Sequence, residues 1–342
     1  MSRWNYFFRR VLLAIPILLF STSIAFLIIR AGPINPVDQI LGPQGDPSAR
    51  LDIAVSLGIR YPNGDPVPLW EQYIDFMTDL LVLDLGQSWV ISPNTPVWDV
   101  IASRAPRTIW LGFWSVLLAI FIGIPLGFYA GLNPNTWGDY AASFGGIVWR
   151  AMPNFWLAVI IAATLSQSQQ LFGFDWQTAW GIQVQVITAP SLTNLHDPDN
   201  LLTAIKQIIP AALVLGSASM GNEMRIGRTA VLETINSNYV ETARAKGVPP
   251  RLIVWKHVFR NALIPLVPII TGEAFLLIGG SVLVETVFAI NGIGKLFFDS
   301  VVQSDLPLAG SLIFFFILLT LSINILQDFL YTIIDPRVGY EE

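Results

Sequence analysis

Few residues in this sequence have the types and spacing that catalysis requires. The chain contains no cysteine and only two histidines, so thiolate zinc sites and cysteine nucleophiles are excluded, and a multi-histidine metal site is not expected. A phosphate-binding loop needs Gly-x4-Gly-Lys-Ser/Thr. The nearest match, 221–229, has its glycines one residue too far apart and lacks the lysine. We therefore expect no catalytic residue, no metal and no cofactor in this chain.

Two charged residues interrupt apolar segments. Arg150 lies within residues 140–170, and Glu273 lies within residues 261–284. A charge inside a membrane is costly and marks a functional site by default. Arg150 and Glu273 either line a pathway or form an intramembrane ion pair, and the sequence favours the two interpretations about equally.

The composition places these charges in a membrane protein. Hydrophobic residues make up 53% of the chain and charged residues 13%, against about 25% charged residues in a typical soluble domain. The net charge of −5 gives no support for nucleic-acid binding. A membrane-spanning helix needs roughly 20 apolar residues. We predict six spans, at residues 11–29, 109–132, 140–170, 207–222, 261–284 and 306–327.

The basic residues predict an orientation. Arg3, Arg9 and Arg10 precede the first span, and the loop 220–260 is rich in Lys and Arg, whereas the segment 31–99 is acidic. Short cytoplasmic loops carry an excess of Lys and Arg. We therefore expect a multi-pass protein of the inner or plasma membrane with both termini in the cytoplasm, and a first span that is a retained signal anchor.

The predicted fold is an all-α polytopic membrane protein with an extracytoplasmic cap and a cytoplasmic loop. Glycines at 123, 127 and 131 permit close helix packing, which we interpret as packing within this chain, and Pro125 predicts a kink. The expected parts are the N-terminus with the first span (1–29), a cap with short helices (30–107), a five-span core (108–335) and a cytoplasmic tail (336–342). The core contains an outer insertion at about 166–205 and a cytoplasmic loop at about 227–260.

That cytoplasmic loop contains the most informative residues. Helix-favouring residues run from Glu241 to Ala245, and Gly247 followed by Pro249 and Pro250 predicts a helix end. A second helix is expected from Arg251 into the membrane. The loop therefore predicts a helix, a sharp turn and a second helix, and the small side chains of Ala243 and Ala245 offer a partner close approach.

This loop resembles that of a known family. Glu241-x-Ala243, then Gly247, then Leu263-x-Pro265 resemble the EAA loop of binding-protein-dependent ABC importer permeases. More narrowly, residues 239–247 and 257–265 resemble the dipeptide/oligopeptide (DppB/OppB-like) group. Four further segments agree with this group in order: 84–88, 152–156, 285–294 and 335–337.

The resemblance implies a permease subunit, without ATP hydrolysis of its own, that carries a small solute. In the family the EAA loop docks in a groove of a cytoplasmic ATPase subunit and couples ATP-driven closure to the membrane helices. The docking residues carried over to this chain are Tyr239, Glu241, Ala243, Arg244, Ala245, Lys246 and Gly247. The implied partners are two ATP-binding subunits that hold ATP and Mg²⁺, a second homologous permease, an extracytoplasmic solute-binding protein and the lipid bilayer, with no nucleic acid.

The solute stays open at this point. Short peptides come first, and oligosaccharides, nickel or another small solute are the alternatives within the family. The chain departs from the family pattern at Thr242, at Asn291 before Gly292, and in the long polar insertion 166–205. A secondary transporter is the alternative class, but such proteins typically contain inverted repeats, and we find no matching halves in this sequence.

Overall fold

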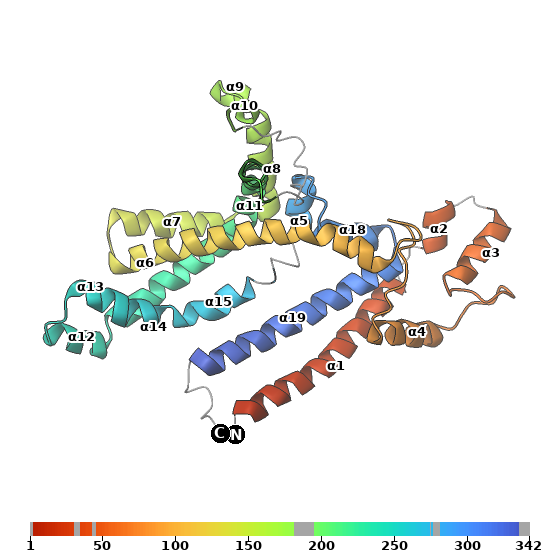
Figure 1. Ribbon diagram of the computed structural model, residues 1–342, viewed down its shortest axis with the longest axis horizontal. Helices are drawn as coiled ribbons and strands as arrows, with labels where there is room; N and C mark the ends of the chain where they lie inside the picture. The colour runs from red at the N-terminus through yellow and green to blue at the C-terminus, as the bar shows by residue number, and fades with distance from the viewer. Residues whose placement is uncertain are drawn as a thin grey trace. The chain divides into compact units, whose positions relative to one another are not determined.

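The computed structural model describes residues 3–30, 35–42, 46–180, 195–273, 275 and 281–334 (Figure 1). Within these ranges the regular structure is helical, and strand-like pairing is limited to two isolated bridges, Arg60 with Pro66 and Gln87 with Pro96. The segment 335–337, the tail 336–342 and residues 181–194 of the 166–205 insertion lie outside the described residues.

Four helices are long and apolar enough to cross a membrane. They are Val97–Leu132, Pro198–Ile235, Pro250–Gly272 and Leu306–Phe329. The helices Trp137–Ala151 and Asn154–Ser166 pass the same test together, which brings the number to five if the pair is one span. The apolar part of the first helix, Leu12–Ile28, is shorter. The described chain is therefore an all-α polytopic membrane protein.

Two of the predicted spans are not single straight helices. In place of 140–170, α7 (Trp137–Ala151) and α8 (Asn154–Ser166) meet at a bend of 100°. Pro153 causes the break because it disfavours helical backbone at Met152, which is extended with ψ 124°. In place of 261–284, the helix ends at Gly272, and α17 (Val282–Val287) begins after Ser281.

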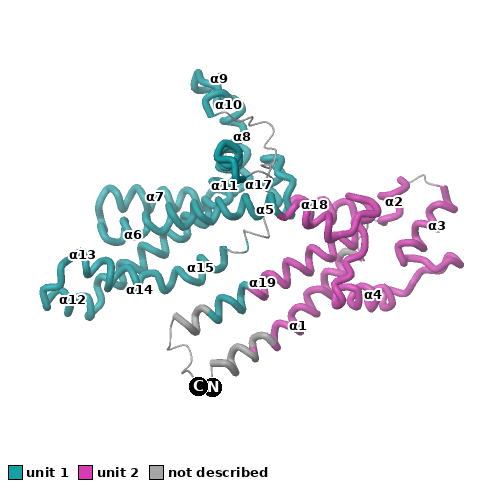
Figure 2. Tube along the Cα trace, in the orientation of Figure 1, with its two compact units in different colours: residues 1, 106–294, 323–342 teal, residues 2–105, 295–322 magenta. Residues whose placement is uncertain are grey.

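The chain divides into two compact units (Figure 2). The core unit contains Pro106–Gly294 and Ile323–Glu342, and the N-terminal unit contains Ser2–Ala105 and Lys295–Ser322. Helices α5 (Val97–Leu118), α18 (Ile293–Val302) and α19 (Leu306–Ile334) contribute residues to both units.

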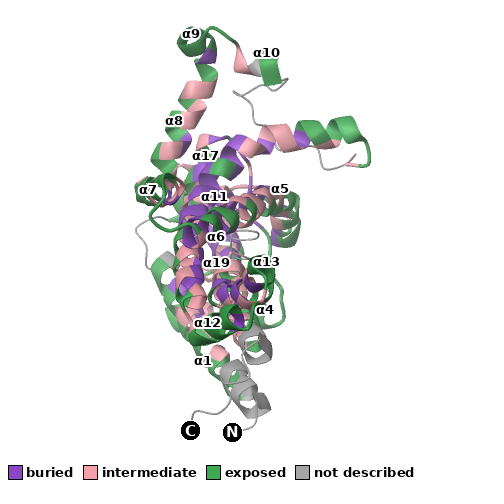
Figure 3. Ribbon diagram, turned by 90° about the vertical axis from the view of Figure 1, so that its left-hand side faces the viewer, coloured by how far each residue is buried: buried purple, intermediate pink, exposed green. Residues whose placement is uncertain are grey.

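The core unit is built around α11 (Pro198–Ile235), whose buried residues are prominent in Figure 3. Asp197 caps this helix by accepting a hydrogen bond from the Asp199 amide, and Pro198 occupies the first turn, where its missing N–H is harmless. α11 packs against α6 (Ile124–Leu132), α7 and α8. These contacts extend the predicted fourth span, 207–222, into a helix of 38 residues.

Glycine makes the close contact between α6 and α11. A Cβ atom added at Gly123 would lie 2.6 Å from the Met220 carbonyl oxygen, and one at Gly127 would lie 2.4 Å from that of Met224. A Cβ at Gly131 would lie 2.7 Å from the Val231 Cβ. The interpretation of the three glycines as packing within this chain is confirmed.

A π-helical turn lies just before Pro125, where the predicted kink stays a prediction. The helix Val97–Leu132 is continuous, and a π-helical segment, η1 (Ala119–Gly123), stands immediately before the proline. Proline lacks the N–H and its ring crowds the carbonyl four residues earlier. The wider π turn accommodates that loss within one long helix.

The N-terminal unit consists of α1 (Arg3–Arg30), three short helices, the start of α5, most of α18 and the first part of α19. The short helices are α2 (Pro36–Leu41), α3 (Pro47–Ser56) and α4 (Leu69–Leu81). Asn35 and Asp46 cap the first two, each followed by proline at the first helical position. α4 packs against α1, where Phe26 contacts Phe76 with ring centroids 5.3 Å apart. Short helices in the segment 30–107 agree with the prediction.

Candidate functional site

The 241–247 turn has the geometry that its glycine and prolines predict. α12 (Asn238–Ala245) ends at Lys246, and Gly247 is left-handed with φ +74°. The Val248 amide donates to the Ala243 carbonyl at 3.1 Å, and the Gly247 amide donates to the Arg244 carbonyl at 2.9 Å. These two bonds form a Schellman motif, which satisfies the last carbonyls of the helix.

A second helix follows the turn, as predicted. It starts with Pro250 and runs through α13 (Pro250–Leu252), the π-helical η3 (Ile253–Phe259) and α14 (Arg260–Ala262). It continues through η4 (Ile264–Leu266) and α15 (Val267–Gly272). The turn is thus covalently continuous with a helix long enough to cross a membrane.

The turn rests on a buried apolar base. Val240 is fully buried and Ala243 is 7% exposed, and both belong to a cluster with Val258, Leu266 and Phe128. The prediction that Ala243 offers its side chain to a partner is therefore wrong. Its small side chain permits close packing of α12 on its own bundle.

The other predicted docking residues form an exposed edge. Tyr239 is 46% exposed. Exposed side chains are also those of Glu241, Arg244, Ala245 and Lys246, and Gly247 is exposed at the turn. The edge combines one acidic and two basic side chains around the small residues Ala245 and Gly247, so a partner can approach the backbone closely while the charges orient it.

A bidentate ion pair that the sequence reasoning missed holds α7 against α11. Arg228 donates from Nε to Asp139 Oδ1 at 2.6 Å and from Nη2 to Oδ2 at 2.8 Å. The buried Asp139 carboxylate also accepts from the Asn135 amide and the Ser143 hydroxyl. Thr136 caps α7 by accepting from the Asp139 amide, so the Thr-x-x-Asp spacing was a local signal for the cap. That spacing gave no signal for the distant arginine.

Arg150 and Glu273 are not brought together. Among the described residues they form no ion pair. Arg150 is exposed near the end of α7, and Glu273 is half-buried just beyond α15. Glu273 accepts a hydrogen bond from the Ser219 hydroxyl of α11 at 2.8 Å.

Comparison with known proteins decides the family. Residues 123–340 match the family described as binding-protein-dependent transport system inner membrane component. The chain is 33% identical to the dipeptide transport system permease protein DppB of Alkalihalophilus pseudofirmus, covering 98% of this chain and 99% of the relative. It is 32% identical to the oligopeptide transport system permease protein AppB of Bacillus subtilis, with the same coverage, and 26% identical to DppB of Escherichia coli.

The chain belongs to this permease family. It is a permease subunit of an ABC importer, and the family is one of transport components rather than enzymes. The predicted resemblance, drawn from the 239–247 segment and the other matching segments, is confirmed.

Glu285 of the permease anchors one of those segments. From the sequence, Glu285 near the end of a predicted span is expected to have an interfacial or helix-contact role, and its side chain is fully buried. The Thr108 hydroxyl donates to its Oε1 at 3.0 Å and accepts from the Ile293 amide at 2.7 Å. A Cβ at Gly292 would lie 2.4 Å from the Thr108 Oγ1, so glycine is required where this segment crosses α5.

Asp305 of the permease anchors another of the segments that match the family, residues 84–88. The buried Asp305 carboxylate accepts hydrogen bonds from the Ser88 hydroxyl and from three consecutive amides, those of residues 89–91, at 3.0–3.1 Å. Consecutive amides that converge in this way form an anion-binding nest. Here the anion is supplied by the chain itself, which fixes the segment 84–91 next to the start of α19.

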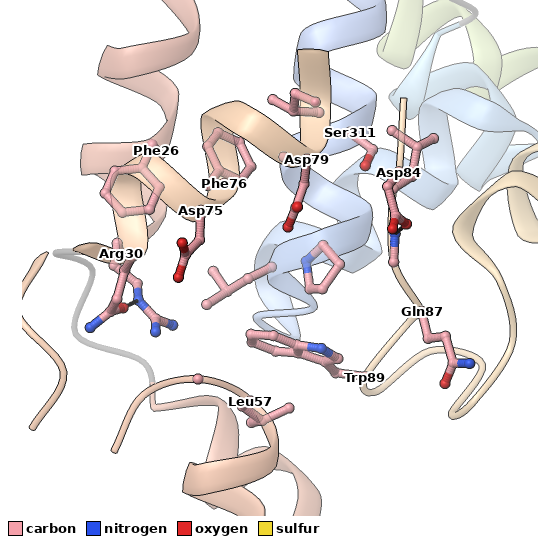
Figure 4. Close-up of a pocket in the computed structure, with 18 of the residues that line it drawn as sticks. Phe26, Arg30, Leu57, Asp75, Phe76, Asp79, Asp84, Gln87, Trp89 and Ser311 are labelled. Carbon is pink, nitrogen blue, oxygen red and sulfur yellow. Dashed lines mark hydrogen bonds between the residues drawn. The ribbon is translucent and has the colours of Figure 1, made fainter. Parts of the chain in front are cut away.

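The N-terminal unit of the permease contains a cavity of about 370 Å³ (Figure 4). Asp75 and Asp79 point into it from α4, and Arg30 lies at one side, where its Nε donates to Gln72. Burial raises the pKa of Asp79 above its ordinary value, and the charges of Asp84 and Asp75 raise it further. The cavity therefore has an acidic wall that favours positive charge.

Proposed function

We propose that this permease forms half of the membrane pathway of an importer for short peptides, driven by ATP that partner subunits hydrolyse. The coupling to ATP hydrolysis is inferred from the exposed residues of the 241–247 turn, here called the 241–247 edge, which lie on the buried apolar base formed by Val240 and Ala243. Support for the solute comes from relatives named dipeptide and oligopeptide transport system permeases, which align over nearly the whole chain.

In the proposed assembly, two ATP-binding subunits hold ATP and Mg²⁺, and one of them docks on the 241–247 edge. Glu241, Arg244 and Lys246 orient the docking, and Ala245 and Gly247 allow close approach. A second homologous permease completes the pathway, and an extracytoplasmic solute-binding protein delivers the solute to the segment 30–107. The chain itself contributes no cofactor, metal or nucleic-acid site to this proposal.

The proposed topology has six spans with both termini in the cytoplasm of an inner- or plasma-membrane protein. α1 is the first span and the bent α7–α8 pair is the third. The segments 30–107 and 166–205 then lie outside, and the loop 227–260 lies inside with the 336–342 tail. The basic composition of residues 220–260 and the acidic composition of 31–99 support this orientation.

Mechanical coupling follows from how the turn is built. ATP-driven closure of the docked subunits would displace α12, and close packing does not absorb such a displacement. Val240 and Ala243 would transmit it to the cluster that contains Leu266 and Phe128, on two membrane helices. The Schellman bonds at Gly247 keep α12 and the following helix in a fixed relation.

The coupling role is tested by charge reversal. Glu241→Lys should weaken copurification of the ATP-binding subunits, or abolish stimulation of ATP hydrolysis by the peptide-loaded binding protein. Glu341→Lys, near the carboxyl end of the sequence, is the control and should leave both unchanged. Wild-type assembly and wild-type stimulated hydrolysis in Glu241→Lys would contradict the coupling role.

The topology and the solute have separate tests. The cysteine-free chain accepts single cysteines, and Asp65→Cys should react with an impermeant thiol reagent in intact cells, whereas Asn236→Cys should not. The reverse pattern would invert the topology. Proteoliposomes that contain the whole complex should take up dipeptides only with ATP and the binding protein present, and uptake of oligosaccharide or nickel instead would replace the proposed solute.

A further inference from the structure

One buried carboxyl group in the core unit has no hydrogen-bond donor among the residues that the structure describes. The side chain of Glu223, in the middle of α11, is fully buried. In the described part of the chain neither of its oxygens has a hydrogen-bond partner. A Cβ at Gly123 would lie 3.1 Å from Glu223 Oε2, so this glycine leaves the space in which the carboxyl group sits. Buried charges are ordinarily paired or hydrogen-bonded, which makes Glu223 an exception that calls for an explanation.

A second carboxyl group lies on the same face of α11. Ser219 and Glu223 are four residues apart and therefore share one face of the helix. The Ser219 hydroxyl donates to Glu273 Oε2 at 2.8 Å, which brings Glu273 to that face. The four-residue spacing therefore places the Glu223 carboxyl group one helical turn from the hydroxyl that holds Glu273. Glu223 is the buried member of this pair and Glu273 is the half-buried, accessible one.

The charged groups around the pair do not neutralise it. η1, α6, α7 and η4 pack on this part of α11, where Gly123, Gly127, Gly146 and Leu266 lie against residues 220–227. In their described residues, α7 contributes Asp139, which is already bound to Arg228, and Arg150, which is exposed and forms no ion pair with Glu273. Arg225 on α11 itself donates to Asn222. Two carboxyl groups thus face one place inside the bundle, where a positive charge would be stabilised by both.

We propose that Glu223 and Glu273 form a binding site inside the membrane for the protonated amino group of the transported solute. The assignment rests on the proposed function, because a peptide carries such an amino group at its N-terminus. Glu273, held by Ser219, meets the ammonium group first. Glu223 adds a second acceptor whose oxygens have no hydrogen-bond partner among the described residues. An ammonium group offers three donors and no acceptor, which matches a site that contains only acceptors.

Transport measurements test the site in the whole complex. Glu223→Gln and Glu273→Gln preserve side-chain size and remove the charge. In proteoliposomes with one and the same binding protein, each should lower the uptake of Ala-Ala at subsaturating concentration by about tenfold or more, since a hydrogen bond to a charged group contributes roughly 1.5–3 kcal/mol and 1.4 kcal/mol is tenfold. Ser219→Ala should give a smaller loss. Asp199→Asn, exposed in the first turn of α11, is the matched control and should transport normally.

A spectroscopic measurement separates this site from the binding protein and from the solute question. Infrared difference spectra of the wild-type permease–ATPase complex in nanodiscs are recorded with Ala-Ala amide, without the binding protein. Carboxyl bands should change with this free amine, should not change with its N-acetyl form, and should be absent in both Gln variants. Copurification of the ATP-binding subunits establishes that the variants have folded.

The outcomes are distinct. Amine-dependent carboxyl bands that vanish in the Gln variants, with reduced uptake, support the site. Wild-type uptake by both Gln variants, or a wild-type spectrum without amine-dependent carboxyl bands, overturns it even if the complex imports peptides. Amine-dependent bands in a complex that imports no peptide would overturn the proposed solute and leave the site standing for another cationic amine.

Discussion

Gly247 allows the coupling role to be tested with a defined energetic perturbation. Its φ is +74°, and a Cβ added there would meet no atom within 4 Å. Substitution therefore adds backbone strain without a clash. A left-handed conformation costs an L-residue roughly 1–2 kcal/mol, and a β-branched residue such as valine is the least suited to it. Ala289 shows that the fold tolerates this strain, since it occupies the equivalent Schellman position after α17 with φ +53°.

That magnitude decides what Gly247→Val should do. A strain of about 2 kcal/mol is small beside the 5–15 kcal/mol stability of a typical domain, so the permease should still insert and pair. It is comparable, however, to the hydrogen bonds that close the turn, at about 1 kcal/mol each. We therefore expect the Schellman turn to open or shift, and the ATP hydrolysis stimulated by the loaded binding protein to fall sharply while expression stays near wild type.

Gly173→Val provides a control matched in strain. Gly173 follows α9 (Ser168–Phe172), has φ +76°, and likewise has no atom within 4 Å of an added Cβ. The strain is equal but lies far along the chain from the 241–247 edge, so coupling should persist. Equal loss of coupling in both variants would show that strain acts through general stability. Normal coupling in Gly247→Val would refute the idea that the turn must be rigid.

Three further predictions concern stability, measured as thermal unfolding of the purified complex. Asp305→Ala should destabilise the permease by about 3 kcal/mol or more, because it leaves a hydroxyl and three amides without their acceptor; an unchanged melting temperature would contradict the nest. Gly127→Ala should cost about 1–3 kcal/mol through overpacking, whereas Gly145→Ala, with no atom within 4 Å of its Cβ, should be neutral. Asp79→Asn should raise the melting temperature at pH 7 and lose that advantage as the pH falls. The raised pKa means that the folded state binds the proton more tightly, so stability drops as the pH rises above the ordinary Asp value; a gain that does not depend on pH would refute this explanation.

Local chemistry explains which parts of the structure could be predicted from sequence. The end of α12 was predictable because Gly247 and the following prolines act on their own backbone. The bend at Met152 has the same kind of cause in Pro153, although an apolar stretch alone suggested one span. The spacing of the glycines at 123, 127 and 131, in η1 and α6, predicted close helix packing, which α11 provides.

Contacts between distant residues could not be predicted in the same way. An alanine at position 243 fits two situations equally well, close approach by a partner protein and close packing within its own helix bundle. The sequence does not distinguish them. The structure places it in the bundle. Arg228 looked like one more positive charge in a basic loop, because the carboxylate that pairs with it is on another helix. Apolar length likewise underestimated α11, which continues through several charged residues before it ends at Ile235.

The fully buried acidic side chains of the described residues differ in whether the chain supplies them with hydrogen-bond partners. Asp139 is satisfied by an arginine, an amide and a hydroxyl, Asp305 by a hydroxyl and three amides, and Glu285 accepts from Thr108. Each of these three ties together segments that are distant in sequence. Glu223 ties nothing together, since neither oxygen has a partner in the described chain. A buried carboxyl group that holds no part of the fold lowers stability unless a ligand or proton meets it, and the neighbouring Glu273 makes a cation the ligand that such a site would select.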